Sequence, residues 1–368
     1  MTTERQVSRR AARASVESSV AVDLSSNDYL GLRNDPRVRA AAIRGIERYG
    51  VGSGGVREIA VGMGVVHELE ERLARYKGVP FVRLAQSGYA ANIGIVPALV
   101  GAGDAVIIDR QAHRSSFDGA TLSGATVVSY AHADMDALAE AIRSTAGRFR
   151  RTLIVTDGVF GLSGDVARLP RIVEIAAGAG AQVMVDDAHG SGVLGHGRGT
   201  VAHFGLVDRV DVQIGTASKA MGVIGGYVAM FSEETAARFA ESRTLIHSTA
   251  LPPHLAAACL ASLEIMESEP ERNDRLWANR RRLADGLVSA GIDIGPSETP
   301  IVPVIVRDPA RTVALGTKIR ARGIVASILV PPKVTPAESR LRLIATSSHT
   351  SADIDLAVSV IADAARSL

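Results

Sequence analysis

The chain has 368 residues, of which 46% are hydrophobic, 22% charged and 4% aromatic. This length is sufficient for two domains, and the near balance of 41 basic against 39 acidic residues argues against a nucleic-acid-binding or membrane-surface protein. The single cysteine, Cys259, excludes a disulfide framework and a thiolate metal cluster and fits a reducing cytosol. No apolar run approaches the roughly 20 residues that span a bilayer. We therefore expect a soluble, cytoplasmic protein that holds no metal.

The N-terminal segment, residues 1–45, is predicted to be an arm rather than a secretory signal, because its Arg- and Ser-rich start contains no continuous apolar stretch. Gly50–Gly55 then matches the dinucleotide-binding pattern GxGxxG. It follows a charged helical stretch instead of an apolar strand, so we interpret it as a flexible loop on the substrate side. His67–Lys77 predicts an amphipathic helix that ends at Gly78, where the Lys77 cation complements the helix dipole.

Residues 46–290 predict a large α/β domain. Compact runs rich in Val, Ile or Met alternate with helical or glycine-rich connections. Continuous apolar strands joined in this way are typical of a mostly parallel central sheet with helices on both faces. The predicted strands are Ala105–Asp109, Thr126–Tyr130, Thr152–Thr156, Gln182–Asp186, Val212–Thr216 and Tyr227–Phe231.

Residues 291–368 predict a small C-terminal α+β domain, which a long helical stretch with turn-like breaks precedes at residues 253–290. In an open α/β sheet, ligands bind beyond the carboxyl ends of the strands. Polar residues directly after the apolar runs of the large domain are therefore the candidate site residues. The elements of the small domain are predicted as strands at Ile301–Arg307, Ile324–Leu329 and Arg340–Thr346 and helices at Thr312–Arg322 and Ala352–Ser367.

Arginine carries nearly all of the positive charge, with 37 Arg against four Lys. Codon usage explains this ratio, but the position of Lys219 is informative in itself. Lys219 follows the predicted strand Val212–Thr216 and is flanked by small residues that leave room for a bulky partner. A lysine at such a place can form a Schiff base with a carbonyl compound or with pyridoxal phosphate (PLP).

An acidic pair and a histidine follow another predicted strand, in Asp186-Asp187-Ala188-His189. A buried carboxylate needs a cationic partner, which a protonated pyridine nitrogen would supply to Asp186. His189 could then hydrogen-bond the phenolic oxygen of the ring. The same pattern is compatible with a metal site or a helix N-cap, although no second ligand cluster has a matching spacing.

Three further groups could contact a cofactor. Ser87-Gly88-Tyr89 opens a helix after an apolar segment and suits a phosphate, although many helices begin this way without a ligand. Ser248 and Thr249 offer two hydroxyls before a later helix. His113 follows a predicted strand and could lie flat on an aromatic ring, although a surface position is the usual one for a single histidine.

Taken in order, these motifs resemble the α-oxoamine synthases, a family of fold-type I PLP-dependent transferases. The resemblance runs from Ser25-Ser-Asn-Asp-Tyr-Leu-Gly31 to Arg340-Leu-Arg342 and covers nearly the whole chain. Gly215–Gly226 is most similar to the branch that contains 2-amino-3-ketobutyrate CoA ligase and 8-amino-7-oxononanoate synthase. The resemblance implies the fold-type I sheet with a small C-terminal domain, and PLP as the cofactor.

The resemblance also implies a role for each candidate residue in a homodimer with shared active sites. It assigns the Schiff base to Lys219, the pyridine nitrogen to Asp186, the phenolic oxygen to His189 and the stacked ring to His113. It places the phosphate at Ser87, Gly88, Tyr89 and Thr216, the neighbouring subunit's cofactor at Ser248 and Thr249, and the substrate carboxylate near Asn27 and Arg342.

The reaction implied is an acyl transfer in which a small amino acid condenses with an acyl-CoA or acyl carrier protein thioester, usually with loss of carbon dioxide. Lys219, once displaced from the cofactor, would remove the α-proton of the amino acid. Transamination or retro-aldol cleavage would use the same lysine and aspartate and remains an alternative. A non-catalytic partner subunit is disfavoured, because relatives of that kind lack the lysine.

Three departures from the family pattern concern the substrates more than the chemistry. Gly161, in the motif that begins at Asp157, replaces a serine that commonly offers its hydroxyl to the cofactor. Met63 replaces a threonine near the expected thioester side, and Ala217 replaces a leucine or phenylalanine before the lysine. Since the cofactor anchors are retained, these departures leave open a specialised biosynthetic acyl donor or a nonstandard amino acid as substrate.

Overall fold

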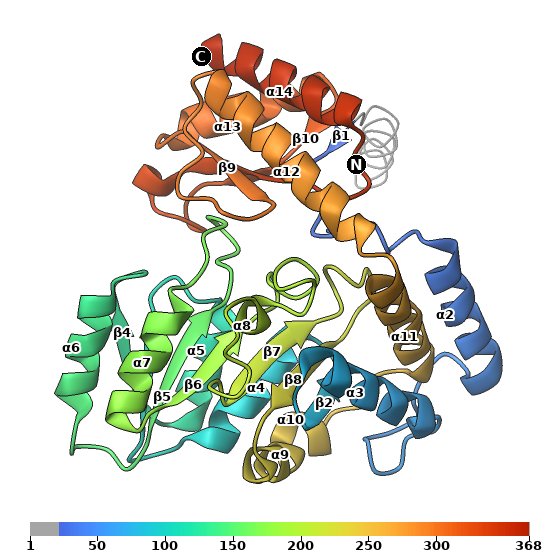
Figure 1. The fold of residues 1–368 in the computed structure, drawn as a ribbon, viewed down its shortest axis with the longest axis vertical. Coiled ribbons are helices and arrows are strands. Elements are labelled where there is room, and N and C mark those ends of the chain that lie inside the picture. Colours follow the sequence, from blue (N-terminus) through green and yellow to red (C-terminus); the bar gives the residue numbers. More distant parts are fainter. Residues whose placement is uncertain (1–21, 368) are drawn as a thin grey trace, which may run out of the picture. The chain divides into compact units, whose positions relative to one another are not determined.

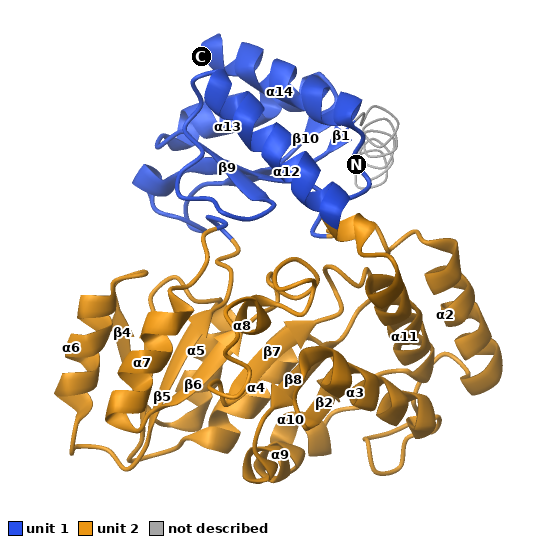
Figure 2. Cartoon of the chain, in the orientation of Figure 1, with its two compact units in different colours: residues 1–27, 162–164, 274–368 blue, residues 28–161, 165–273 orange. Residues whose placement is uncertain are grey.

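The computed structural model describes residues 22–367, which form two compact units (Figures 1 and 2). The smaller unit contains residues 1–27, 162–164 and 274–368, and the larger unit contains residues 28–161 and 165–273. The start of the expected arm, residues 1–21, lies outside the described residues. The domain limits that we place after residues 45 and 290 remain predictions.

The larger unit is built on a seven-stranded sheet in the order β2-β8-β7-β6-β5-β3-β4. Every pairing is parallel except those of β8, which runs antiparallel to both of its neighbours. The predicted, mostly parallel sheet is therefore confirmed. The strands are β2 (Phe81–Ala85), β3 (Ala105–Asp109), β4 (Thr126–Tyr130), β5 (Thr152–Asp157), β6 (Gln182–Asp186), β7 (Val212–Thr216) and β8 (Gly226–Met230).

Helices cover both faces of this sheet, which explains why its central strands are apolar throughout. Val106 and Ile108 of β3 pack with Leu99 on one face, whereas Ile107 packs with Val173 on the other. The helices of the larger unit are α2 (Pro36–Tyr49), α3 (Met63–Lys77), α4 (Gly88–Leu99), α5 (Arg114–Ser123), α6 (Met135–Thr145), α7 (Leu169–Ala179), α8 (Thr200–His203), α9 (Glu233–Ala240), α10 (Arg243–Ile246) and α11 (Pro253–Ser268). Because α2 ends directly before Gly50, the GxGxxG segment follows a helix, as we expect of a chance match.

The smaller unit contains the antiparallel sheet β11-β12-β9 and the parallel pair β1 (Val22–Asp23) and β10 (Ile324–Val325). The predicted strand Ile324–Leu329 is divided because β10 pairs with β1, whereas β11 (Ser327–Leu329) pairs with β12 (Arg340–Ile344). The remaining elements are β9 (Ile301–Ile305), α13 (Pro309–Ala321), the short 3-10 helix Pro336–Glu338, α14 (Ser351–Arg366) and most of α12 (Glu271–Ser289). Within residues 22–367, no helix combines the length and the apolar composition that crossing a bilayer requires.

Lys77 ends α3, as predicted, but its side chain is buried and paired with a carboxylate, which the sequence did not indicate. Its Nζ lies 3.0 Å from Asp187 Oδ2 and 2.5 Å from the carbonyl oxygen of Arg198, and its side chain is 1% exposed. Burial opposes the charge, but the Asp187 carboxylate outweighs it and holds the pKa of Lys77 above its usual value. Lys77 follows Leu69 and Leu73 at helical spacing, which places it on the buried face of α3.

Candidate active site

Most of the predicted site residues lie along one edge of the seven-stranded sheet. Because β2, β3, β5, β6 and β7 are parallel, their carboxyl ends meet at this edge, where ligands of open α/β sheets bind (Figure 1). Ser87 follows β2, His113 follows β3, Asp157 ends β5, Asp186 ends β6, Thr216 ends β7, and Lys219 comes three residues later.

Lys219 lies in a closed turn between β7 and β8. The Ala217 N–H donates to the Gly225 carbonyl at 2.9 Å, and the Gly222 N–H donates to the Lys219 carbonyl at 2.9 Å. Gly222 has a φ of 67°, and a Cβ there would lie 2.3 Å from the Arg33 backbone nitrogen, so only glycine fits. The turn therefore fixes the backbone from which the half-buried Lys219 side chain extends.

Asp186 is a buried carboxylate with neutral hydrogen-bond donors. Its Oδ2 accepts from Asn92 Nδ2 at 2.7 Å and its Oδ1 from the Ala188 N–H at 3.1 Å. Asp157 is its neighbour across the β5–β6 pairing, and burial together with the Asp186 charge raises the pKa of Asp157 well above its usual value. Two buried carboxyl groups side by side fit a cationic ligand group such as a protonated pyridine.

His189 extends from the turn after β6, and its Nδ1 lies 2.8 Å from the hydroxyl of the buried Tyr29. A Cβ at Gly161 would lie 2.6 Å from His189 Nε2. The His189 ring therefore occupies the space that a side chain at position 161 requires. This contact gives the departure at Gly161 a physical reason, since a serine there would displace the histidine.

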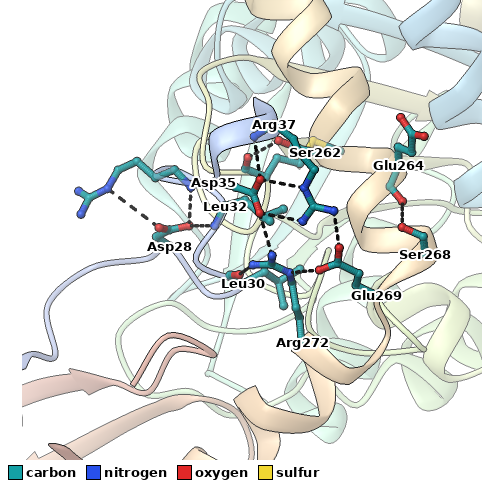
Figure 3. Close-up of polar contacts among 12 residues, drawn as sticks. Asp28, Leu30, Leu32, Asp35, Arg37, Ser262, Glu264, Ser268, Glu269 and Arg272 are labelled. Atoms are coloured by element: carbon teal, nitrogen blue, oxygen red, sulfur yellow. Dashed lines mark hydrogen bonds and ion pairs between the residues drawn. The ribbon is translucent and has the colours of Figure 1, made fainter. Parts of the chain in front are cut away.

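Tyr29 lies directly before Leu30 in a segment that a cluster of ion pairs and hydrogen bonds with Arg272 and Arg37 holds in place (Figure 3). Arg272 donates to the Leu30 carbonyl at 3.1 Å and to Asp35 Oδ2 at 2.8 Å, and Arg37 donates to the same Asp35 oxygen at 2.9 Å. The hydrogen bond from Arg37 lowers the pKa of Asp35 to about 2. The cluster therefore stays ionised at neutral pH and holds the chain that carries Tyr29.

The predicted phosphate residues meet at the start of α4. Ser87 is the N-cap, and its hydroxyl accepts from the Ala90 N–H at 3.1 Å. A Cβ at Gly88 would lie 3.5 Å from Thr216 Cβ, so the start of α4 lies against the end of β7. The Tyr89 hydroxyl donates to Asp118 Oδ2 at 2.8 Å. The N-terminus of α4, with the hydroxyls of Ser87 and Thr216 beside it, suits a phosphate group.

The other predicted residues lie in different segments. Thr249, which follows Ser248, pairs with Val56 in an isolated bridge, and its carbonyl accepts a hydrogen bond from the side chain of Gln86. Asn27 and Arg342 belong to the smaller unit, where Arg342 Nη2 donates to Asn27 Oδ1 at 2.9 Å. The roles of all four residues remain predictions. Within the described part of the chain, no three His, Cys, Asp or Glu side chains are placed to hold a metal ion.

Tyr29 and Asn92 were not assigned roles from the sequence. Tyr29 precedes its partner His189 by 160 residues, so no local pattern reports their contact. Asn92 lies four residues after Gly88, one helical turn further along α4 and on the same face. That spacing indicates a side chain close to the predicted phosphate motif.

His132, which follows β4, lies between Asp109 at the end of β3 and Asp165 in the loop after β5. Its Nδ1 lies 3.0 Å from Asp109 Oδ1 and its Nε2 lies 2.9 Å from Asp165 Oδ2. Burial alone would lower the pKa of His132, but the hydrogen bonds to Asp109 and Asp165 outweigh it and raise this pKa to about 9. His132 is therefore a cation between two carboxylates at neutral pH.

We expect His132→Gln to remove a pH-dependent part of the stability. Because the folded-state pKa of about 9 exceeds the unfolded value of 6.5, the contribution is complete below pH 6.5 and is lost as the pH rises through 9. Urea unfolding of both proteins should give a wild-type advantage of about 2 kcal/mol in acid that shrinks in alkali. A difference that is constant across this range would contradict the prediction.

The chain is similar to proteins of a known family over nearly its whole length. Residues 19–361 match the aminotransferase class I and II family. An 8-amino-7-oxononanoate synthase from Symbiobacterium thermophilum is 48% identical over 357 residues, which cover 97% of this chain and 91% of that protein. The enzyme of the same name from Thermoanaerobacter pseudethanolicus is 43% identical, covering 94% and 88%.

Solved structures of related enzymes have a similar fold. A serine palmitoyltransferase from S. paucimobilis with bound PLP has a TM-score of 0.90 and 29% identity, covering 94% of this chain and 87% of that one. An 8-amino-7-oxononanoate synthase from Francisella tularensis has a TM-score of 0.81 and 25% identity, covering 95% and 99%. The predicted fold-type I transferase fold and PLP cofactor are thus confirmed. The chain belongs to the aminotransferase class I and II family and is a PLP-dependent α-oxoamine synthase, an acyltransferase that joins an amino acid to an acyl thioester.

Proposed function

We propose that the chain makes 8-amino-7-oxononanoate from alanine and a pimeloyl thioester. The observation that carries the proposal is the 48% identity, over 97% of the chain, to a synthase with that product name. The name describes a nine-carbon acid with a ketone at C7 and an amine at C8. Division of the C7–C8 bond leaves a seven-carbon dicarboxylic acyl group and an aminoethyl group, which is alanine without its carboxyl group.

The residues at the sheet edge would hold the cofactor as follows. Asp186 pairs with the pyridine nitrogen, and His113 covers one face of the ring. Ser87-Gly88-Tyr89 and Thr216 bind the phosphate. Bound PLP supplies an aldehyde for the substrate amine and an electron-accepting ring.

Two side chains move or hold protons in this proposal. The Lys219 amine, once released by the substrate, takes the proton from the amino acid's α-carbon and returns one after carbon dioxide is lost. The Tyr29 hydroxyl lies 2.8 Å from His189 Nδ1, and in this proposal it donates to that nitrogen, so that His189 carries its proton on Nε2 for the phenolic oxygen. A permanently charged arginine could not replace Lys219, because the reaction needs a neutral amine.

The remaining predicted residues would act on the substrate and on the assembly. Arg342, oriented by Asn27, presents a planar guanidinium that suits the carboxylate of the amino acid. Ser248 and Thr249 reach the cofactor of a second copy, so the enzyme acts as a homodimer.

A matrix of amino acids against acyl thioesters tests the proposal. We expect alanine with pimeloyl-CoA or pimeloyl-acyl carrier protein to release free thiol, carbon dioxide and a product of the expected mass in equal amounts. Glycine and serine, and acyl chains without a terminal carboxylate, should react far more slowly. Thiol release with another pair of substrates would overturn the choice of substrates. Exchange of amino groups with keto acids, with no thioester consumed, would overturn the reaction itself.

A further inference from the structure

Asn92 lies at the junction of three elements that carry predicted cofactor residues. It is 1% exposed and belongs to α4, and its Nδ2 lies 2.7 Å from Asp186 Oδ2 at the end of β6. The same nitrogen lies 3.0 Å from Ser115 Oγ in α5 and 3.2 Å from the Gly88 carbonyl. A carboxylate and a carbonyl can only accept, so the NH₂ side of the amide must face Asp186 and Gly88.

Ser115 extends this contact to His113. The Ser115 N–H donates to His113 Nδ1 at 3.3 Å, and Ser115 Oγ lies 2.6 Å from the same ring nitrogen. Because a backbone N–H can only donate, Nδ1 must be an acceptor, and the imidazole proton lies on Nε2. The Ser115 hydroxyl therefore donates to His113, and its oxygen accepts from Asn92, whose two amide protons are shared among the three acceptors Asp186, Ser115 and Gly88.

The result is a continuous path of hydrogen bonds from Asp186 through Asn92 and Ser115 to His113. The path joins the two residues that are predicted to contact the cofactor ring, Asp186 and His113. Asn92 donates to the Asp186 carboxylate at 2.7 Å, and Asp186 in turn contributes to the raised pKa of its neighbour Asp157. The path also keeps the His113 imidazole in a single tautomer, because the hydroxyl and the backbone N–H of Ser115 both point to Nδ1.

We propose that Asn92 and Ser115 are positioning residues for the cofactor, Asn92 by holding the Asp186 carboxylate and Ser115 by fixing the tautomer of His113. The proposal rests on the assignment of Asp186 and His113 to the cofactor site. An amide at position 92 adds no charge beside the Asp186–Asp157 pair, whereas a carboxylate of the same shape would add repulsion and remove both donors.

The test measures PLP binding by full-length chain from which cofactor has been removed. We expect Asn92→Ala to weaken the Kd for PLP by roughly 10- to 100-fold, the value for loss of a hydrogen bond to a charged group, and Asn92→Asp to weaken it further. Ser115→Ala keeps the Asn92–Asp186 contact and should change the Kd by less than about threefold.

The second readout is the ¹⁵N spectrum of labelled histidines in the same chains, with the His113 signal assigned by its loss in His113→Gln. We expect one tautomer in the wild type. Ser115→Ala keeps the long hydrogen bond from the backbone N–H but loses the 2.6 Å contact of the hydroxyl, so the second tautomer should become detectable, and Asn92→Ala should produce a smaller change in the same direction. A purely structural role would leave this signal unchanged. The matched control is Asn279→Ala, since Asn279 is also buried but donates to the carbonyls of Thr346 and His349 in the smaller unit. It should lower the thermal midpoint without changing the PLP Kd or the His113 signal.

The Asp186→Asn variant separates two kinds of failure. If Asp186→Asn weakens PLP binding and Asn92→Ala does not, the role of Asn92 is wrong and the site assignment stands. If neither variant changes the Kd, the site assignment is wrong too. An unchanged His113 signal in Ser115→Ala overturns the role of Ser115, and this variant keeps the test decisive should Asn92→Ala fail to fold.

Discussion

Lys219→Ala should lose at least about 10³-fold in kcat, because in our proposal Lys219 supplies both the amine that holds the cofactor and the base that moves the α-proton. Borohydride reduction of wild-type enzyme should fix the cofactor to the peptide that contains Lys219. Reduction of the variant should leave the cofactor free. Because Lys219 is half-buried in a turn whose hydrogen bonds are made by the backbone, we expect the fold to be retained, with a thermal midpoint close to that of the wild type.

Lys333→Ala is the matched control for this experiment, since Lys333 is exposed in a loop of the smaller unit. It should keep wild-type turnover and wild-type borohydride labelling. Cofactor fixed to Lys333 in the Lys219→Ala protein would show that the catalytic lysine has been assigned to the wrong residue.

Lys77→Met should cost about 3–5 kcal/mol of stability, because it leaves the Asp187 carboxylate buried without its cation. Asp187 is fully buried and also accepts from the Thr200 N–H at 3.0 Å, so its charge has no route to water. Urea unfolding of the cofactor-free chain measures the loss. Because Asp187 is next to Asp186 in the sequence, the variant should also bind PLP more weakly.

The double variant Lys77→Met, Asp187→Asn separates the lost pair from the lost lysine packing. It removes both charges and keeps an acceptor for Thr200, so we expect it to recover more than half of the lost stability. Lys318→Met, at an exposed lysine that donates to the Ser367 carbonyl at 2.8 Å, should cost less than about 0.5 kcal/mol. A Lys77→Met cost as small as that of Lys318→Met would refute the buried ion pair.

The limits of the central strands could be predicted to the residue because those strands are buried on both faces. Ala105–Asp109, Gln182–Asp186 and Val212–Thr216 are continuous apolar runs, and the structure begins and ends them at the predicted residues. Ile324–Leu329 looks like one strand in the sequence, but it changes pairing partner at Ala326. Pairing partners are tertiary information that no local pattern contains.

Some residues of the candidate site could be predicted from the sequence, whereas others could not. Groups that follow strands, such as Asp186 and Lys219, could be found because topology alone brings strand ends together. The contacts of Tyr29 with His189 and of Lys77 with Asp187 join segments 160 and 110 residues apart, and both are set by packing. Lys77 shows that residue type and position can mislead, since a lysine at a helix end is normally solvated but this one is buried.

The reversal of β8 has a consequence for how the catalytic base moves. In the other strand connections at this edge the chain runs onward into a loop or helix, but after Lys219 it folds straight back into the sheet at Gly226. The backbone on both sides of Lys219 is thus held in place while its side chain can rotate. In the proposed reaction, the lysine would reach the cofactor and the substrate by rotation about its side-chain bonds, at an entropic cost set by one lysine's rotamers and not by a reorganising loop.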